Sequence, residues 1–114
     1  MRADDLVRLR HMRDAALEAI GFMRDRDASD LAEDRMLQFA VIRAIEIVGE
    51  AATHVSESTI TEYPALPWRA ASSMRNRLIH GYFDIDTEIV AVTVEEELPA
   101  LVEQLDRVLK TEEE

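Results

Sequence analysis

One segment in the second half of the chain carries the side chains best suited to chemistry on a phosphate. Residues 63–83 contain no Asp or Glu, and their basic and titratable side chains are Arg69, Arg75, Arg77 and His80. The three arginines give this segment a formal charge of +3, whereas the other 93 residues carry 10 basic and 24 acidic side chains. Affinity for nucleic acids comes largely from Lys and Arg neutralising phosphates, so the net charge of −11 argues against a nucleic-acid ligand everywhere except here.

The segment also contains Asn76 and Tyr82 but no carboxylate pair that could hold magnesium, so we consider RNA cleavage without a metal. In that reaction the 2′-hydroxyl loses a proton, the phosphorane charge is stabilised and the 5′ oxygen gains a proton. Histidine, with an ordinary pKa of about 6.5, can act as base or acid, and arginine is a permanent donor fork for phosphate oxygens. One histidine cannot easily perform both proton transfers at once. A symmetric dimer would supply two copies of His80 and of Arg75 around one cleft.

The spacing of these residues limits how they can meet. On an ideal helix Asn76 and His80 share a face, because they are four residues apart. Arg75 and His80 are five apart and diverge by roughly 140°. Two arrangements therefore remain open: the helix end unwinds near Gly81, or the site is completed by residues from another chain.

The sequence predicts an all-α fold, because Gly and Pro number three each and the β-branched residues fall within longer helical patterns. We expect one domain, residues 1–114, folded as an up-and-down bundle of four to five helices. Apolar periodicity places helices at about 4 or 5 to 24, about 30 to 56, 68–80 and about 86–110. Pro99 predicts a break near residue 97 or 98, and residues 111–114 are expected to fray.

Capping residues mark several of these boundaries. Ser29 or Asp30 can cap the second helix, with Glu33 placed to close a capping box on Asp30. Pro67 suits the first turn of the third helix, and Gly81 suits its end.

The second helix has more apolar surface than a single packing contact needs. One stripe consists of Leu37, Val41, Ala44, Ile45, Val48, Ala52 and Val55, and a neighbouring stripe consists of Met36, Ala40, Ile47 and Ala51. A helix that is apolar on two sides usually has two partners. The second partner is either another part of the same bundle or a second copy of the chain, and periodicity alone leaves both open.

Composition excludes several classes of protein. The absence of Cys removes a disulfide scaffold, a thiolate zinc site and a cysteine nucleophile. No apolar run approaches the roughly 20 residues that span a bilayer, and the charged start of the chain lacks the apolar core of a signal peptide. We therefore expect a soluble, cytoplasmic protein that needs no cofactor and does not contact a membrane.

Other polar residues have simpler interpretations. A histidine near a helix end more often interacts with the helix C-terminus than performs catalysis. His11 and His54 are predicted to be surface residues. A metal site could be imagined from Glu46, Glu50 and His54. We favour instead a pairing of Arg43 with Glu46, and of Glu50 with an arginine of the third helix.

The string Arg75-Asn76, three residues, His80-Gly81-Tyr82 resembles the signature Arg, four residues, His, any residue, Tyr of the HEPN superfamily. Residues 44–52 resemble the central helix of its HepT-like branch, and residues 63–68 resemble the run that precedes its signature. The similarity extends from about residue 34 to residue 109.

This resemblance implies a metal-independent ribonuclease toxin of a bacterial type VII-like toxin–antitoxin pair, active as a homodimer and directed at tRNA. By position, Arg75 and His80 would be catalytic, while Asn76 and Arg77 would support catalysis or bind phosphate. Tyr82 would be AMPylated by an MntA-like nucleotidyltransferase antitoxin. Two other functions stay open: a non-catalytic helical module that binds a nucleotide or a nucleotidyltransferase, and a purely structural dimer.

Overall fold

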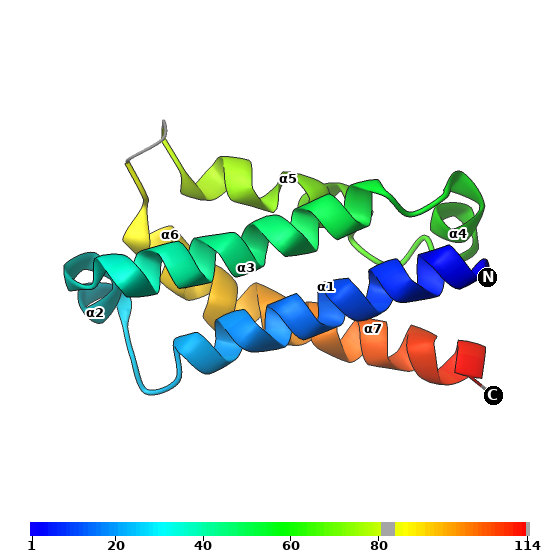
Figure 1. Ribbon diagram of the computed structural model, residues 1–114, viewed down its shortest axis with the longest axis horizontal. Helices are drawn as coiled ribbons and strands as arrows, with labels where there is room; N and C mark the ends of the chain where they lie inside the picture. Colours follow the sequence, from blue (N-terminus) through cyan, green and yellow to red (C-terminus); the bar gives the residue numbers. More distant parts are fainter. Residues whose placement is uncertain (81–83, 114) are drawn as a thin grey trace.

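The computed structural model describes residues 1–80 and 84–113, and within them the chain is almost entirely helical (Figure 1). The elements are α1 (Ala3–Phe22), α2 (Ala28–Glu33), α3 (Arg35–Thr53), α4 (Glu57–Glu62), α5 (Trp68–Leu78), α6 (Thr87–Val92), the π-helical turn η1 (Thr93–Glu97) and α7 (Leu98–Glu113). In the described ranges the only β-type pairing is a single bridge between Ile79 and Ile85. The predicted all-α fold is confirmed.

The longer helices form an up-and-down bundle. Figure 1 shows α7, α1, α3 and α5 lying side by side along the long axis, and α1 packs against both α3 and α7 while α5 packs on α3. The short helices α2 and α6 pack together at one end, whereas α4 lies at the other end with both chain termini. None of the helices in the described part of the chain combines the length and apolar character needed to cross a bilayer.

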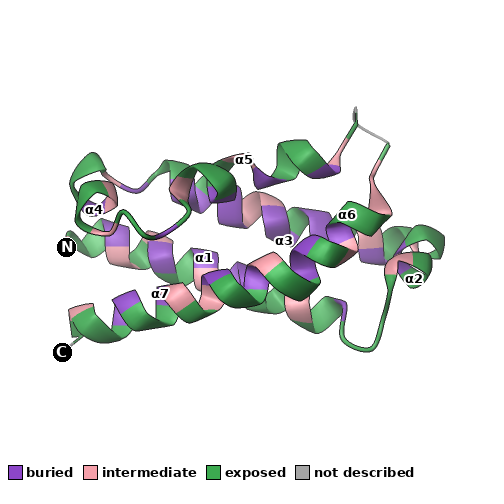
Figure 2. Ribbon diagram, turned by 180° about the vertical axis from the view of Figure 1, so that it is seen from behind, coloured by how far each residue is buried: buried purple, intermediate pink, exposed green. Residues whose placement is uncertain are grey.

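The two apolar stripes predicted on the second helix are buried to different extents (Figure 2). Every residue of the first stripe is buried in the core. In the second stripe Ala51 is buried, Ala40 and Ile47 are half-buried, and Met36 is 82% exposed. Phe39, beside Met36, is 59% exposed and lies under the guanidinium of Arg35. Among the described residues, nothing therefore covers the amino-terminal part of α3 on this side.

The long helix predicted over residues 30–56 is confirmed over α3, but its predicted start is wrong, because the chain breaks at Asp34. Asp34 is extended, and its side chain caps α3 by accepting a hydrogen bond from the Leu37 backbone at 3.0 Å. The preceding helix α2 is capped by Asp27, which forms a capping box with Asp30. The predicted roles of Ser29 and Glu33 as cap and box partner are therefore wrong. The sequence allows either set of caps, because acidic residues occur at every third or fourth position here.

The carboxy-terminal region begins as predicted and ends later. Asp86 caps α6 by accepting from the Ile89 backbone at 3.1 Å. The predicted break before Pro99 takes the form of the π-helical turn η1, after which Pro99 lies in the first turn of α7, where its missing N–H is tolerated. We expected a helix end at residue 110 and fraying beyond it. Instead α7 continues to Glu113, and Glu112 accepts a hydrogen bond from the Tyr63 hydroxyl.

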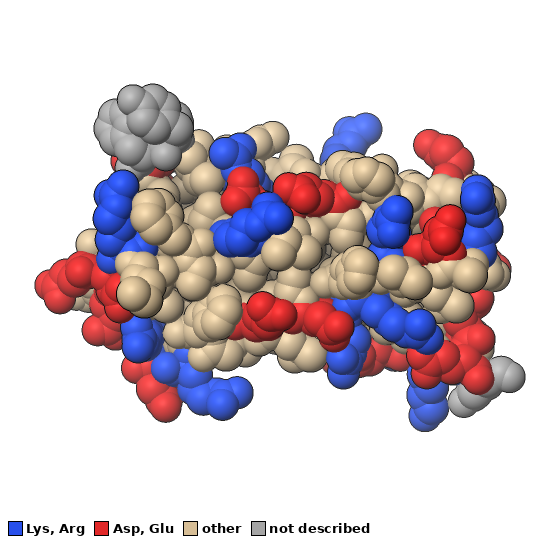
Figure 3. Space-filling model, viewed as in Figure 1, with Lys and Arg blue, Asp and Glu red and all other residues tan. Residues whose placement is uncertain are grey.

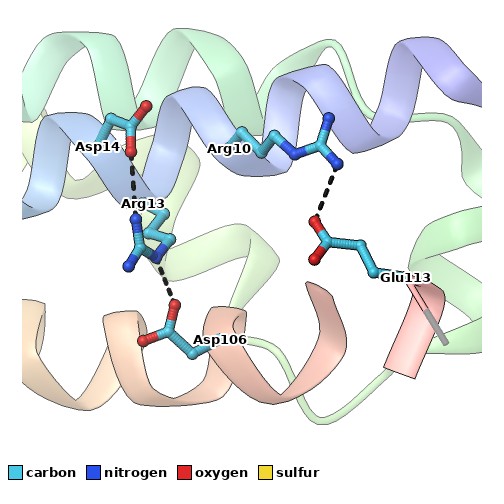
Figure 4. A network of polar contacts seen from close by, with 5 residues as sticks. All are labelled: Arg10, Arg13, Asp14, Asp106 and Glu113. Atoms are coloured by element: carbon cyan, nitrogen blue, oxygen red, sulfur yellow. Dashed lines mark hydrogen bonds and ion pairs between the residues drawn. The ribbon is translucent and has the colours of Figure 1, made fainter. Parts of the chain in front are cut away.

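Ion pairs join α1 to α7 along their exposed edge (Figure 4). Arg10 contacts Glu113 at 2.9 Å, and Arg13 contacts both Asp106 on α7 and Asp14 on its own helix. Exposed ion pairs each contribute little to stability, about 0–1 kcal/mol. Their main effect is to give each of these charges a partner inside the chain.

Candidate functional site

The position of α5 depends on a close approach to α3 at Gly49. A Cβ built on Gly49 would lie 3.2 Å from the Ala71 carbonyl oxygen and 3.3 Å from that of Ser72. Such distances are tighter than ordinary van der Waals contact, so any larger residue would push the two backbones apart by a few tenths of an ångström. Gly49 thereby sets the height of α5 above α3 and the position of Arg75, one turn beyond Ala71.

Arg75 is held by α3 through one of its three nitrogens. The Nε atom of Arg75 lies 2.9 Å from Oε2 of Glu46, and the arginine side chain remains 47% exposed. No hydrogen bond or ion pair engages its two terminal nitrogens within residues 1–80 and 84–113. Two parallel donors fixed in one plane match the geometry of two phosphate oxygens. The arrangement therefore orients Arg75 and leaves its fork available to a ligand.

The acidic residues of α3 pair differently from the prediction. We expected Arg43 to pair with Glu46 and Glu50 to pair with an arginine of the third helix. Instead Arg43 contacts Glu50 at 3.3 Å, and Glu46 takes the arginine of α5, Arg75. The rotation of α3 relative to α5 decides between the two, because both carboxylates lie on the exposed side of the helix.

The end of α5 differs from the prediction in a way that concerns His80 directly. We expected the helix to reach His80 and to stop at Gly81, but it ends at Leu78. Ile79 is extended and bridges Ile85, while the His80 backbone donates to the Asp84 carbonyl at 2.6 Å. His80 therefore lies outside the helix and does not share a helical face with Asn76.

The His80 side chain faces solvent beside an acidic residue that sequence analysis missed. Its Nε2 atom lies 3.9 Å from Oδ2 of Asp86, and the ring side chain is 62% exposed. Asp86 could have been identified only as a helix cap, because its proximity to His80 depends on the bridge between Ile79 and Ile85. Asp86 is therefore the acidic side chain that contacts His80 within the described residues.

Within one chain the two catalytic candidates contact different elements. Arg75 reaches α3 through Glu46, whereas His80 reaches Asp86 at the start of α6. No hydrogen bond joins Arg75 to His80 in the part of the chain that the structure describes. Of the two arrangements left open by the spacing, the helix does unwind, and it does so before His80 rather than near Gly81.

Of the remaining candidates within the described residues, Arg77 has a carboxylate partner and Asn76 is exposed. Arg77 makes two contacts with the carboxylate of Glu97 in η1, at 3.2 and 3.5 Å. Asn76 is exposed and lines a hollow between α3 and α5, the α5 hollow, whose other lining residues are Glu46, Gly49, Glu50, Thr53, Ser72 and Arg75. Tyr82 lies outside the described residues.

In the folded chain, acidic side chains from other elements nevertheless contact the segment of residues 63–83. The carboxylates absent from residues 63–83 are supplied by α3 and η1, through Glu46 and Glu97. Figure 3 shows the result on one face of the molecule, where basic and acidic side chains alternate around a broad uncharged area over α1 and α3. Among the described residues no group of three His, Asp or Glu side chains is placed to hold a metal ion.

Comparison with known proteins identifies the group to which these features correspond. The chain matches the sequence model of one family, described as Ribonuclease HepT-like, over residues 12–108. It is 38% identical over 89 residues to a protein of Thermococcus cleftensis named "Probable ribonuclease HepT", covering 78% of this chain and 81% of that protein.

Two further relatives carry ribonuclease names. The chain is 34% identical over 93 residues to "Putative RNase MJ1380" of Methanocaldococcus jannaschii, covering 82% of this chain and 85% of the relative. It is 32% identical over 83 residues to "Putative RNase TTE0752" of Caldanaerobacter subterraneus, covering 73% and 74%. No solved structure gives a significant match.

Proposed function

This chain belongs to the HepT-like ribonuclease family and is an enzyme of that class, and from this premise we propose that it is a toxin that cleaves RNA without a metal at a site shared by two copies of the chain. The observation that carries the proposal is the state of Arg75, whose Nε contacts Glu46 while the side chain lines the α5 hollow and stays 47% exposed. This geometry suits a bidentate contact with a phosphate.

The chemical step is an attack of the 2′-hydroxyl oxygen on the adjacent phosphorus. A neutral imidazole of His80 accepts the 2′ proton, the O2′–P bond forms, and the P–O5′ bond breaks as the 5′ oxygen receives a proton from a second, protonated His80. The products are a 2′,3′-cyclic phosphate and a 5′-hydroxyl end. Arg75 stabilises the charge on the non-bridging oxygens, which is where such donors contribute most to catalysis.

The need for two protonation states supports a dimer. A neutral and a protonated imidazole are required in the same turnover, and each chain offers one histidine in this segment. A two-fold axis close to α3 and α5 would place two copies of Arg75 and of His80 around one cleft.

The exposed part of α3 provides a surface for this dimer. Met36 and Phe39 are 82% and 59% exposed, although they lie on the same long helix whose other side forms the core. Exposed apolar patches on small proteins commonly mark interfaces. A second copy packed here would also bring two α5 hollows close together, because Glu46 and Glu50 continue the same exposed side of α3.

We place the substrate and the regulation of this activity as the family resemblance implies. The substrate is tRNA, Asn76 contacts its phosphate, and the antitoxin is an MntA-like nucleotidyltransferase. That partner would inactivate the protein by AMPylation: the Tyr82 hydroxyl attacks the α-phosphorus of ATP, an O–P bond forms, and pyrophosphate leaves. An anionic group two residues from His80 would repel the substrate phosphate.

The proposal is tested by incubating the purified protein with tRNA in excess EDTA and identifying the ends of the fragments. We expect cleavage with cyclic phosphate ends, and His80→Ala should remove it while the thermal midpoint of unfolding stays unchanged. Equal cleavage by His80→Ala would overturn the assigned chemistry. Absence of cleavage by the folded parent would favour the non-catalytic module.

The regulatory part needs a separate measurement. Coexpression with the neighbouring nucleotidyltransferase, followed by intact-mass analysis, should show the addition of whole AMP units. Tyr82→Phe should stay unmodified and should cleave RNA in the presence of the partner. Modification of Tyr82→Phe to the same extent would show that another residue is the acceptor.

A further inference from the structure

A second hollow lies between α1 and α3, and its lining residues have no role in the proposed cleavage reaction. It is lined by Arg8 and His11 from α1, by Ile47, Glu50 and Ala51 from α3, and by His54, which directly follows α3. Two of the three histidines in the chain, 43 positions apart in sequence, therefore line one depression. We call it the histidine hollow.

The ring of His54 is held in a defined orientation. Its Nδ1 atom lies 2.8 Å from the backbone oxygen of Glu50. A carbonyl oxygen can only accept, so Nδ1 carries the hydrogen in this contact, and Nε2 is the nitrogen left for a ligand. No contact engages Nε2 within residues 1–80 and 84–113. The histidine is thus oriented by the backbone of the last turn of α3, and its ring lines the hollow.

Arg8 differs from most arginines of this protein. The arginines at positions 10, 13, 26, 43, 75, 77 and 107 all form ion pairs. In the described part of the chain Arg8 forms none, although its side chain is half-buried at the edge of the hollow. The carboxylate in the hollow, that of Glu50, is already paired with Arg43. Arg8 is therefore the charge that this depression offers to an anion.

The two hollows adjoin each other across α3. Glu50 lines both, with Arg75 and Asn76 on the α5 side and with His11 and His54 on the α1 side. A flexible polymer that places one phosphate at Arg75 and crosses α3 at Glu50 would enter the histidine hollow next. Single-stranded RNA is such a polymer.

The chemistry of the histidine hollow matches an unpaired nucleotide. Ile47 and Ala51 provide apolar surface from α3, and imidazole rings are among the side chains on which splayed RNA bases stack. An arginine at the edge can neutralise the phosphate of the same nucleotide. We propose that the histidine hollow binds an unpaired nucleotide of the RNA substrate adjacent to the phosphate held at the α5 hollow, an inference that rests on the proposed ribonuclease function.

The test measures binding rather than cleavage, so that it remains informative if the proposed chemistry fails. A fluorescent single-stranded oligonucleotide with 2′-O-methyl groups cannot be cleaved by 2′-hydroxyl attack, and its dissociation constant is read by anisotropy. Base stacking contributes about 1–3 kcal/mol, so His54→Ala should weaken binding about 10-fold. His11→Ala and Arg8→Ala should each weaken it. Arg107→Ala, which removes an exposed arginine of α7 paired with Glu103, should bind as the parent does.

Two further measurements separate this role from a structural one. His54→Phe keeps an aromatic ring but loses Nδ1, and it should bind more tightly than His54→Ala. A perfectly paired RNA duplex should bind parent and His54→Ala equally, because it offers no unpaired base. The proposal is overturned if His54→Ala binds the single strand as tightly as the parent does, or if it weakens the duplex to the same extent. Normal single-strand binding together with lost association of a protein partner would reassign the hollow to that partner.

Discussion

The two polar centres of this molecule differ in how their charged groups are exposed and paired. At the end that carries the chain termini (Figure 1), Asp5 is 2% exposed and accepts from the Ser56 backbone at 3.0 Å, from the Ser56 hydroxyl at 2.5 Å and from Thr59 at 2.7 Å. We call this group the N-terminal anchor. At the α5 hollow, the exposed Arg75 has one carboxylate partner and two unoccupied terminal nitrogens among its described contacts.

The difference separates a structural polar group from one that can act on a ligand. A buried carboxylate is tolerated only when hydrogen bonds replace the water it has lost, and the N-terminal anchor provides them. An exposed arginine needs no such compensation. Its remaining donors are free to change partner at little cost, which a catalytic contact requires. Substitutions at the first centre should therefore reduce stability, and those at the second should reduce activity.

The largest effect is expected at the α5 hollow. Arg75→Ala should reduce RNA cleavage about 10³-fold, because it removes a donor that stabilises the transition-state charge. Its stability should change by no more than about 1 kcal/mol, since the pair with Glu46 is exposed. Single-turnover cleavage and urea denaturation measure the two effects. Arg107→Ala is the matched control. If Arg75→Ala lost as much stability as a substitution in the N-terminal anchor, the distinction between a structural and a catalytic centre would be wrong.

The N-terminal anchor should show the reverse pattern. Asp5→Ala leaves the donors of Ser56 and Thr59 buried without an acceptor, and we expect a loss of about 3 kcal/mol in the free energy of unfolding. Asp4→Ala changes an exposed neighbour on the same turn of α1 and should have little effect. Below the unfolding transition, cleavage by Asp5→Ala should match the parent. Equal stability of the Asp5→Ala and Asp4→Ala variants would contradict this role.

The anchor also predicts a dependence of stability on pH. Burial acts to raise the pKa of Asp5, but the hydrogen bonds from Ser56 and Thr59 outweigh it and hold the pKa below its ordinary value of 3.8. The carboxylate therefore stabilises the fold fully above that value, and this contribution is lost as the pH falls through the folded-state pKa. The advantage of the parent over Asp5→Asn in urea should shrink on acidification. An advantage that grows toward low pH would exclude this mechanism.

The smallest effect concerns the backbone packing that positions Arg75. Gly49→Ala places a methyl group 3.2 Å from the Ala71 carbonyl, so α5 must move by a few tenths of an ångström and Arg75 with it. We expect a net loss of about 1 kcal/mol, because overpacking outweighs the gain in helix propensity. Gly21→Ala is the control, since nothing lies within 4 Å of its Cβ position. Reduced cleavage by Gly49→Ala alone would show that the height of α5 matters to the site.

Local sequence patterns are sufficient to predict the helical class, the buried stripe of α3, the start of the last helical region near Asp86 and the segment that holds Arg75 and His80. These features depend on periodicity and on short side-chain to backbone contacts, which neighbouring residues specify without reference to the rest of the chain. The family signature is local in the same sense, so the amino-acid sequence alone marks Arg75 and His80 as catalytic candidates.

The partners of the charged side chains, in contrast, follow from tertiary packing. Glu46 rather than Glu50 pairs with Arg75, Asp5 is buried, and α5 ends at Leu78 because Ile79 pairs with Ile85. Each outcome depends on how one helix is rotated and seated against another, and that is set by packing among residues far apart in sequence. A local pattern identifies the side chains able to do chemistry. Packing determines which of them keep unoccupied donors for a ligand.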